Sequence, residues 1–352
     1  MATKPPAIGT AQFKMLEKLC NAVSVSGEEN EVRKIVLEEV GPYADVVKVD
    51  ALGNLLATKK GHGAKRLRVM LDAHMDEVGF MLVADDGDGI YEFKTIGGIE
   101  SHYLPGKQVV AGKDNTPGVI GTKPIHLTKS DERKHSIPVD SLRVDLGPGV
   151  KAKIGDRGTF APNFRHTGTS IISKSIDDRI GVATLIELFK TAPSNIDVLA
   201  AFTVQEEIGL RGAKVAAYAF HPDLGIAIDS TPANDLPMQW NGENTFYNTR
   251  LGSGPAIYLA NSSTLDDPRL VRFIAEIAEK GNISFQYRQP GGGGTDAAAI
   301  QRSLAGIPVV SVSIPHRYTH TSFSIARVDD WKNTLSLLFA ALKRMTPDIL
   351  KR

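Results

Sequence analysis

Hydrophobic residues are patterned in two different ways along the chain. In the first 75 residues, and again after residue 170, apolar positions at helical spacing alternate with short, nearly continuous apolar runs. Runs such as 67–73 and 196–204 are typical of strands buried on both faces of a sheet. The pattern predicts helices over 11–22, 28–40, 178–191, 210–220, 266–281, 295–304 and 328–345, and strands over 46–49, 55–58, 67–73, 196–204, 224–230, 284–288 and 307–314. This alternation indicates an α/β fold with a mixed central sheet flanked by helices.

The middle of the chain has a different pattern of apolar and turn-forming residues. Between residues 80 and 165, short β-type runs are broken by clusters of Gly, Pro and Asp, which is typical of a small all-β domain. The polar stretch 128–135 is expected to be a loop inside it. We therefore predict one catalytic α/β domain built from residues 1–79 and 166–352, with a barrel-like β domain inserted over residues 80–165.

One local signal concerns the start of the second predicted helix. Ser26 is followed three residues later by Glu29, which is the spacing of a capping box. In that motif the two side chains accept hydrogen bonds from backbone N–H groups at the helix start. The sequence therefore predicts a capping box before the helix over 28–40.

Composition and charge exclude several classes of function. The chain of 352 residues has 41 Lys plus Arg and 40 Asp plus Glu, so its net charge is +1. The chain therefore has no excess of positive charge of the kind that binds nucleic acid or an anionic membrane surface. Cys20 is the only cysteine, which excludes an intrachain disulfide and a cysteine metal site. The chain has no apolar run of about 18 residues and no secretory h-region, so we expect a cytoplasmic protein.

Candidate chemistry lies where predicted strands end and helices begin, which is where ligands bind in open α/β sheets. His74 follows the strand over 67–73, and Asp76 stands two residues further on, where it could orient the imidazole of a metal ligand. The alternative for His74 is a hydrogen-bonded histidine of the core. Asp177 and Asp178 stand at a helix start, where an acidic N-cap is the simpler explanation.

Three further segments carry the same pattern. Glu206 and Glu207 follow the apolar strand over 196–204, so one could bind a metal while the other moves protons. Asp229 ends the strand over 224–230, where the alternative is again a helix N-cap. His316 and His320 follow the strand over 307–314. Of these two, we expect His316 to be a surface residue and His320 to be a metal ligand.

The combined set indicates a metal site. Two histidines with several carboxylates and no cysteine suit Zn²⁺, Co²⁺ or Mn²⁺. Two metal ions about 3.5–4 Å apart need a bridging carboxylate and further ligands on each ion. The ligand count is met by His74, Asp177, Glu207, Asp229 and His320. Glu206 is left over as the general base for a water held between two divalent ions.

These segments, in this order, resemble the TET-type dinuclear-metal aminopeptidases, a family that includes glutamyl, leucyl and deblocking aminopeptidases. The stretches that carry the resemblance are AHMDEVGF (73–80), SIDDRIGVA (175–183), QEEIGLRGA (205–213), AIDST (227–231), GGGGTDA (291–297) and IPHRYTH (314–320). Shorter matches near the start and in the middle extend the resemblance over essentially the whole chain. The sequence departs from the family's pattern at Thr321–Ser324 and at 98–102, and neither departure replaces a proposed metal ligand.

The resemblance assigns roles to the site residues. It implies two divalent ions per subunit, Zn²⁺ or Co²⁺, the first on His74, Asp177 and Asp229, and the second on Asp177, Glu207 and His320. Asp177 would bridge the ions, while Asp178 would be structural. Glu206 would be the catalytic base, and Asp76 would orient His74. The substrates would be short peptides, cleaved at the N-terminus.

The resemblance also implies an assembly, and it leaves other activities open. The family's β domain caps the catalytic domain and builds dimers, which assemble into tetrahedral homododecamers that only small unfolded peptides enter. An N-acyl-amino-acid deacylase would use the same metals and base. A metal-independent endoglucanase could use paired carboxylates, but it would leave the two histidines without a task. A non-catalytic scaffold would be expected to have lost a ligand or the base, and none is missing.

Overall fold

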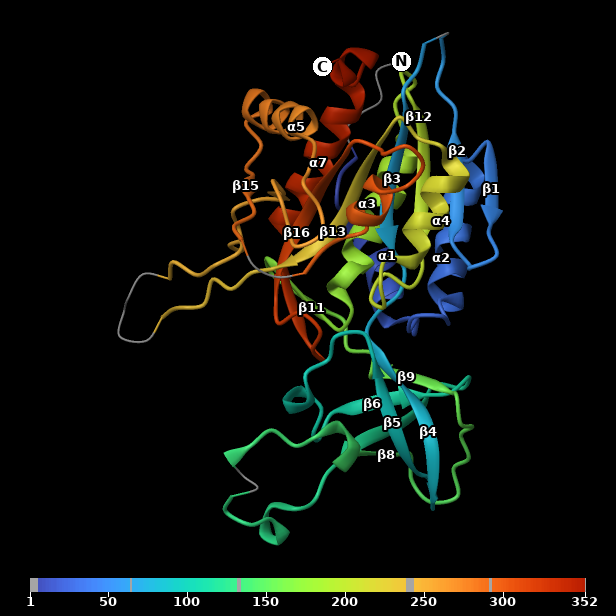
Figure 1. The fold of residues 1–352 in the computed structure, drawn as a ribbon, viewed down its shortest axis with the longest axis vertical. Coiled ribbons are helices and arrows are strands. Elements are labelled where there is room, and N and C mark those ends of the chain that lie inside the picture. Colours follow the sequence, from blue (N-terminus) through green and yellow to red (C-terminus); the bar gives the residue numbers. More distant parts are fainter. Residues whose placement is uncertain (1–5, 64, 132–133, 239–243, 291–292, 352) are drawn as a thin grey trace.

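The chain folds into two bodies, a large helix-covered sheet and a smaller β barrel below it in the view of Figure 1. The computed structural model describes residues 6–63, 65–131, 134–238, 244–290 and 293–351. Parts of two predicted features, the loop over 128–135 and the glycine run over 291–294, lie outside the described residues. The predicted division at residues 79/80 and 165/166 stays a prediction.

Among the described residues, eleven strands form the large mixed sheet. Its central four strands, in the order β12-β3-β13-β16, run parallel, and antiparallel strands extend both edges. The full order is β1-β2-β12-β3-β13-β16-β17-β11-β10, and β14 pairs with β16 and β15. The strands are β1 (Val46–Val49), β2 (Leu55–Lys59), β3 (Arg68–His74), β10 (Arg165–Thr167), β11 (Ser170–Ser173), β12 (Asp197–Thr203), β13 (Leu224–Pro232), β14 (Ala256–Ile257), β15 (Gln286–Tyr287), β16 (Val309–Arg317) and β17 (Ser324–Arg327).

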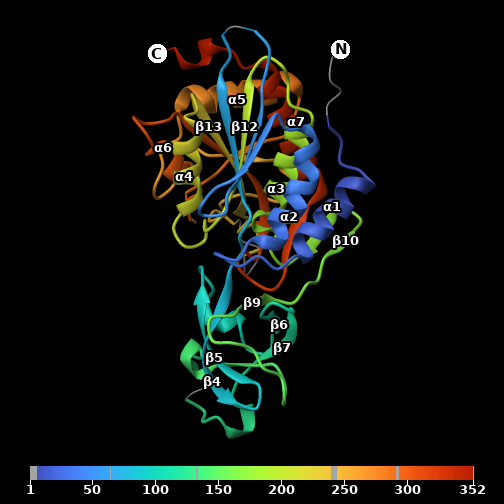
Figure 2. The same cartoon turned by 90° about the vertical axis from the view of Figure 1, so that its right-hand side faces the viewer.

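Helices cover both faces of this sheet (Figure 2). Alternate residues of β3 pack on opposite sides: Leu71 joins the larger core, and Met70 joins the smaller one. The larger core lies under α1 (Thr10–Asn21), α2 (Asn30–Val40), α3 (Ile176–Lys190), α5 (Pro268–Gly281) and α7 (Val328–Arg344), and the smaller under α4 (Arg211–Phe220) and α6 (Ala297–Gln301). Within the described residues, no helix combines the length and the apolar character that crossing a bilayer would require.

The second body is a closed barrel with its own core. Its strands pair in the order β4-β5-β8-β7-β6-β9. Phe80 and Phe93 meet edge to face inside it, with ring centroids 5.4 Å apart. The strands are β4 (Gly79–Gly87), β5 (Ile90–Ile96), β6 (Gln108–Ala111), β7 (Thr116–Gly121), β8 (Arg143–Asp145) and β9 (Arg157–Phe160). Short 3-10 turns occupy Gly41–Tyr43, Ser101–Tyr103, Ile125–Leu127, Val139–Ser141 and Pro347–Leu350.

The predicted elements are present, but some of their details differ. The capping-box prediction is wrong: α2 begins at Asn30, and Glu29, not Ser26, occupies the N-cap position, without a side-chain hydrogen bond to the helix start. Glu29 instead accepts a hydrogen bond from the N–H of Gly27, and Ser26 donates to Asp76. The predicted helix over 295–304 is shorter, and the strand over 284–288 shrinks to two residues.

We expect the larger core to carry much of the free energy of unfolding. Leu19 on α1 is fully buried, whereas Leu37 on α2 is 43% exposed. Leu19→Ala should lower the free energy of unfolding by about 2–5 kcal/mol, because it leaves a cavity in a packed core. Leu37→Ala, the matched control, should change it by less than about 0.5 kcal/mol in urea unfolding monitored by circular dichroism. Equal losses in the two variants would contradict this packing.

Candidate metal centre

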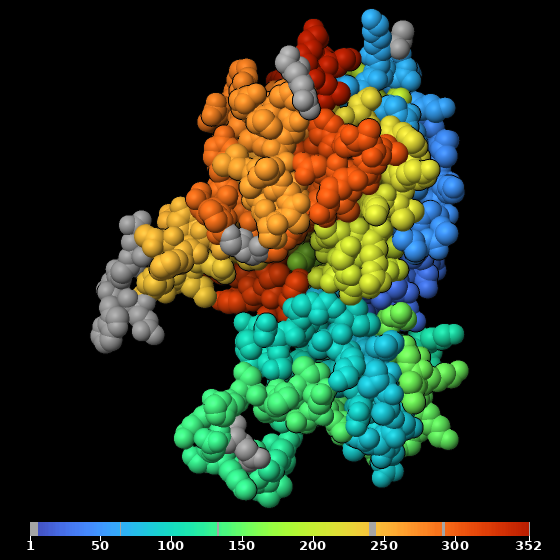
Figure 3. All heavy atoms as spheres, viewed as in Figure 1, coloured from blue at the N-terminus to red at the C-terminus, as the bar shows by residue number. Residues whose placement is uncertain are grey.

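The residues singled out in the sequence converge on one edge of the sheet. Because β3, β12, β13 and β16 are parallel, their carboxyl ends lie at a common edge, where ligands bind in such folds. A cavity of about 290 Å³ opens there. Figure 3 shows the surface hollowed where the sheet body meets the barrel. The cavity lining includes all five predicted ligands and the predicted base, namely His74, Asp177, Glu206, Glu207, Asp229 and His320.

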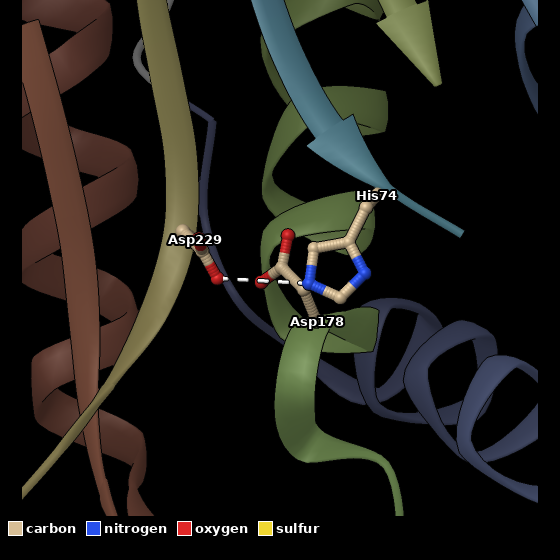
Figure 4. Close-up of side chains that lie close together, drawn as sticks. All are labelled: His74, Asp178 and Asp229. Atoms are coloured by element: carbon tan, nitrogen blue, oxygen red, sulfur yellow. Dashed lines mark ion pairs between the residues drawn. The ribbon is translucent and has the colours of Figure 1, made fainter. Parts of the chain in front are cut away.

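His74 forms one half of the site. Its Nε2 atom lies 3.2 Å from Oδ1 of Asp177 and 3.8 Å from Oδ1 of Asp229. Figure 4 shows His74, Asp178 and Asp229 pointing toward one another from β3, α3 and β13. Ligand atoms of these three residues all lie within 4.8 Å of one another, as do those of His74, Asp177 and Glu207. Two overlapping groups of donors therefore surround one imidazole.

His320 forms the other half. Its Nε2 atom lies 3.2 Å from Oε2 of Glu207 and 3.5 Å from Oδ2 of Asp177. The second ring nitrogen, Nδ1, lies 2.8 Å from the backbone oxygen of Gly98, in the loop that follows barrel strand β5. Asp177 thus turns one oxygen toward each histidine, which is the arrangement that a bridging carboxylate needs.

The local backbone directs these carboxylates into the cavity. Asp177 is extended (φ −73°, ψ 111°), so the regular part of α3 starts only after Asp178. The N–H groups of Gly209 and Leu210 both donate to the carbonyl of Glu206, which forms the turn after β12. This turn places Glu206 and Glu207 beside the cavity at the carboxyl-terminal edge of the sheet.

Burial and crowding dominate the electrostatics. Burial raises the pKa of Asp229 to about 8 and holds the pKa values of Glu206 and Asp178 well above their usual range. Burial disfavours the charged imidazolium of His320, yet the carboxylates of Asp177 and Glu207 raise its pKa to about 11. A cation bound among these carboxyls would favour their charged forms and so offset the effect of burial on their pKa values.

The donor set fits divalent metal ions. Imidazole nitrogen and carboxylate oxygen are ligands that Zn²⁺ and Co²⁺ accept, and thiolate is absent from the lining of this cavity. A divalent ion would offset the burial and the repulsion between carboxylates that together raise these acidic pKa values. The arrangement thus has donors, charge and space for metal ions.

Asp76 supports the site from behind. Its Oδ1 accepts the N–H of Glu206 at 3.0 Å, and its Oδ2 accepts the N–H of Glu207 at 3.2 Å. Ser26 donates its hydroxyl to the same Oδ2 at 2.6 Å. Nδ1 of His74 lies 3.1 Å from the backbone oxygen of Asp76 and 3.5 Å from its Oδ1. One carboxylate thus holds the Glu206 turn and lies beside the histidine.

A buried ion cluster lies behind this loop. Both oxygens of Glu77 accept from Nζ of Lys174, at 2.8 and 2.7 Å, and Oε1 also accepts from Arg179 at 3.0 Å. Arg179 donates to the carbonyls of Met75 and Asp76 as well. The side chains of Lys174 and Arg179 are at most 1% exposed. The cluster therefore fixes the backbone that carries His74 and Asp76.

Sequence reasoning missed some of the surroundings and was wrong on one residue. His316 is fully buried on β16, not at the surface, and its Nε2 atom lies 2.9 Å from Oγ1 of Thr319. Asp178 joins the donor group of His74 and Asp229. Tyr258 and Arg288 also line the cavity, although no motif marks them in the sequence. An arginine close to a two-residue strand gives no periodic signal.

Comparison with known proteins identifies the family to which the chain belongs. The family described as M42 glutamyl aminopeptidase matches residues 53–337 of the chain. The chain belongs to this family. It is 34% identical to the lysyl aminopeptidase of Pyrococcus furiosus over 349 residues, which cover 95% of this chain and 98% of the relative.

Solved structures agree with this assignment to the M42 family. An aminopeptidase of the archaeon Desulfurococcus kamchatkensis superposes with a TM-score of 0.90 at 31% identity, covering 96% of both chains. The TET1 peptidase of Pyrococcus horikoshii, which can assemble into a tetrahedron or a large octahedral shell, gives 0.83 at 32% identity, covering 95% of this chain and 100% of its own. The predicted fold class and the TET-type resemblance are thus confirmed. The chain is a peptide-bond hydrolase of the aminopeptidase class.

The buried cluster behind the site generates a stability prediction. Glu77→Gln would leave Lys174 and Arg179 buried without their anionic partner, so the free energy of unfolding should fall by about 3–5 kcal/mol. Glu276→Gln removes an exposed carboxylate paired with Lys280 and should leave that free energy nearly unchanged. Urea unfolding of both variants measures the difference. If the Glu77→Gln protein is as stable as the control, the cluster does not contribute to the free energy of unfolding.

Proposed function

We propose that this chain is a two-metal aminopeptidase that removes N-terminal residues from short peptides. The observation that carries the proposal is the position of Asp177, whose two oxygens face His74 and His320 separately. A carboxylate in that position can be shared by two metal ions. Asp229 and Glu207 lie beside the two histidines and complete a separate ligand set for each ion.

The ligand assignment follows the two halves of the site. One ion would be held by His74, Asp177 and Asp229, and the other by Asp177, Glu207 and His320. Zn²⁺ or Co²⁺ suits these nitrogen and oxygen donors. When bound, such ions supply Lewis acidity, which makes a water more acidic and polarises the scissile carbonyl.

Glu206 is the proposed general base. It lines the cavity next to the ligand Glu207, and burial holds the pKa of its carboxyl well above the usual range. A carboxyl with a raised pKa can take a proton from the attacking water and return it to the leaving amine. Asp76 keeps this base in place through the N–H of Glu206.

The size of the cavity is compatible with removal of single residues. About 290 Å³ is just below the range for small-molecule pockets, roughly 300–1,000 Å³. The backbone of Gly98 from the barrel body closes one side against His320. Such a space suits the end of a peptide chain better than its middle.

The proposal extends to assembly and location. We infer that the barrel over residues 80–165 caps the catalytic domain, formed by 1–79 and 166–352, and contributes to dimers. We also propose a tetrahedral homododecamer, in line with the tetrahedron of the Pyrococcus horikoshii relative. Cytoplasmic peptides would be the substrates.

The test is hydrolysis of a panel of aminoacyl-p-nitroanilides by metal-stripped protein, before and after addition of Zn²⁺ or Co²⁺. Activity should appear only with metal. Glu206→Gln should lower kcat by about 10²–10⁴-fold, because the proton transfer loses its base, while two ions still bind. Glu279→Gln, which changes an exposed glutamate of α5, should retain full activity.

Three outcomes would contradict the proposal. Turnover by the stripped protein would argue against metal dependence, and full activity of Glu206→Gln would argue against the base. If the protein with two ions bound hydrolyses none of the p-nitroanilides but does hydrolyse N-acetyl amino acids, the chain is a deacylase.

A further inference from the structure

Arg288 is a buried cation on the wall of the catalytic cavity. It follows β15, is 5% exposed, and lines the same cavity as the metal-site residues. Its Nε atom donates to Oγ1 of Thr231 at 3.1 Å. Its Nη2 atom, in contrast, has no hydrogen-bond partner within the part of the chain that the structure describes. A buried N–H donor without a partner is costly, so this nitrogen is expected to serve a ligand.

The charge of Arg288 also lacks an anionic partner among the residues that the structure describes. A guanidinium stays protonated in proteins. Among the described residues, no carboxylate oxygen lies within salt-bridge distance of it. Its close neighbour is the ring of Tyr258, whose centroid lies 4.6 Å from Cζ. Asp266 interacts with it at longer range, but burial raises the pKa of that carboxyl to about 7.

The position of Arg288 relative to the metal site is set by β13. Thr231, which accepts from Arg288, is two residues beyond Asp229, so both side chains lie on the same side of the strand. Two residues of a strand span about 7 Å. The Tyr258 hydroxyl also donates to Thr231, at 3.1 Å, and closes this end of the cavity. The guanidinium thus lies against the same side of β13 as the proposed ligand Asp229, and both residues line one cavity.

We propose that Arg288 binds the side-chain carboxylate of an acidic N-terminal residue, so that this chain selects peptides that begin with Glu or Asp. The inference rests on the proposed function. A carboxylate satisfies both needs of the guanidinium, a hydrogen-bond acceptor and a negative charge, and charge-assisted bonds of this kind are strong. A lysyl or arginyl side chain would meet repulsion in the same place.

Family membership does not decide this preference. The Pyrococcus furiosus relative carries the name lysyl aminopeptidase, whereas the family description names glutamyl aminopeptidase. The side chain selected must therefore depend on residues of the individual cavity. Among the described residues that line this cavity, Arg288 combines an unused donor with a charge that has no carboxylate at salt-bridge distance.

The test compares two substrates that differ only in charge, the p-nitroanilides of Glu and Gln. Wild-type metal-loaded enzyme should have the higher kcat/KM on the Glu substrate. Arg288→Met should lower kcat/KM on Glu by about 10- to 100-fold, mainly through KM, and should leave the value for Gln and Leu within about 3-fold. Arg288→Lys should retain part of the preference for Glu.

Arg250→Met is the matched control. Arg250 is exposed and stacks on Tyr247, with Cζ 3.9 Å from the ring centroid, so the variant loses an arginine outside the cavity. It should keep the wild-type ratio of Glu to Gln hydrolysis. Because p-nitroanilides have no peptide carboxyl terminus, a change in this ratio reports the side chain alone.

The outcomes separate this inference from the proposed function. If wild-type enzyme cleaves Leu or Lys substrates but does not discriminate Glu from Gln, the role of Arg288 is overturned and the aminopeptidase activity stands. Equal losses on Glu and Gln in Arg288→Met would overturn it too, since they would indicate a structural role. If Arg288→Met does not fold, an unchanged Glu-to-Gln ratio in Arg288→Lys would have the same meaning. Failure to cleave any substrate would count against the proposed function instead.

Discussion

The burial of several carboxylates in one cavity, together with the repulsion among them, is the constraint on which the site depends. Four parallel strands and the start of α3 place acidic side chains in one cavity, where burial raises the pKa values of Asp229, Glu206 and Asp178. The fold supplies two histidines to this cavity, and the remaining negative charge favours divalent cations. The polypeptide must therefore hold groups together that would separate if the backbone were free to relax.

The surrounding structure supplies that rigidity. Asp76 binds two consecutive N–H groups of the turn after β12, and the cluster of Glu77, Lys174 and Arg179 holds the backbone before it. The barrel contributes as well, since the carbonyl of Gly98 lies against His320. Residues of both bodies thus line one small cavity.

Much of this arrangement could be predicted from the sequence, because it follows from strand order. Apolar runs that end in His74 or in Glu206 and Glu207 mark strands whose ends meet, and the structure does bring the predicted ligands together. Local signals failed where tertiary contacts were stronger. Ser26 binds Asp76, 50 residues away, instead of capping α2, and His316 is buried because it is still part of β16. Arg288 could not be found, since its role depends on Thr231 and Tyr258, which are distant in sequence.

The most direct test of the central claim is a crystal structure of the protein loaded with Zn²⁺, with diffraction recorded above and below the zinc absorption edge. The account predicts two anomalous peaks in each cavity, with the carboxylate of Asp177 between them and one histidine on each ion. A single ion, two ions that share no contact with Asp177, or a cavity without anomalous signal would contradict it.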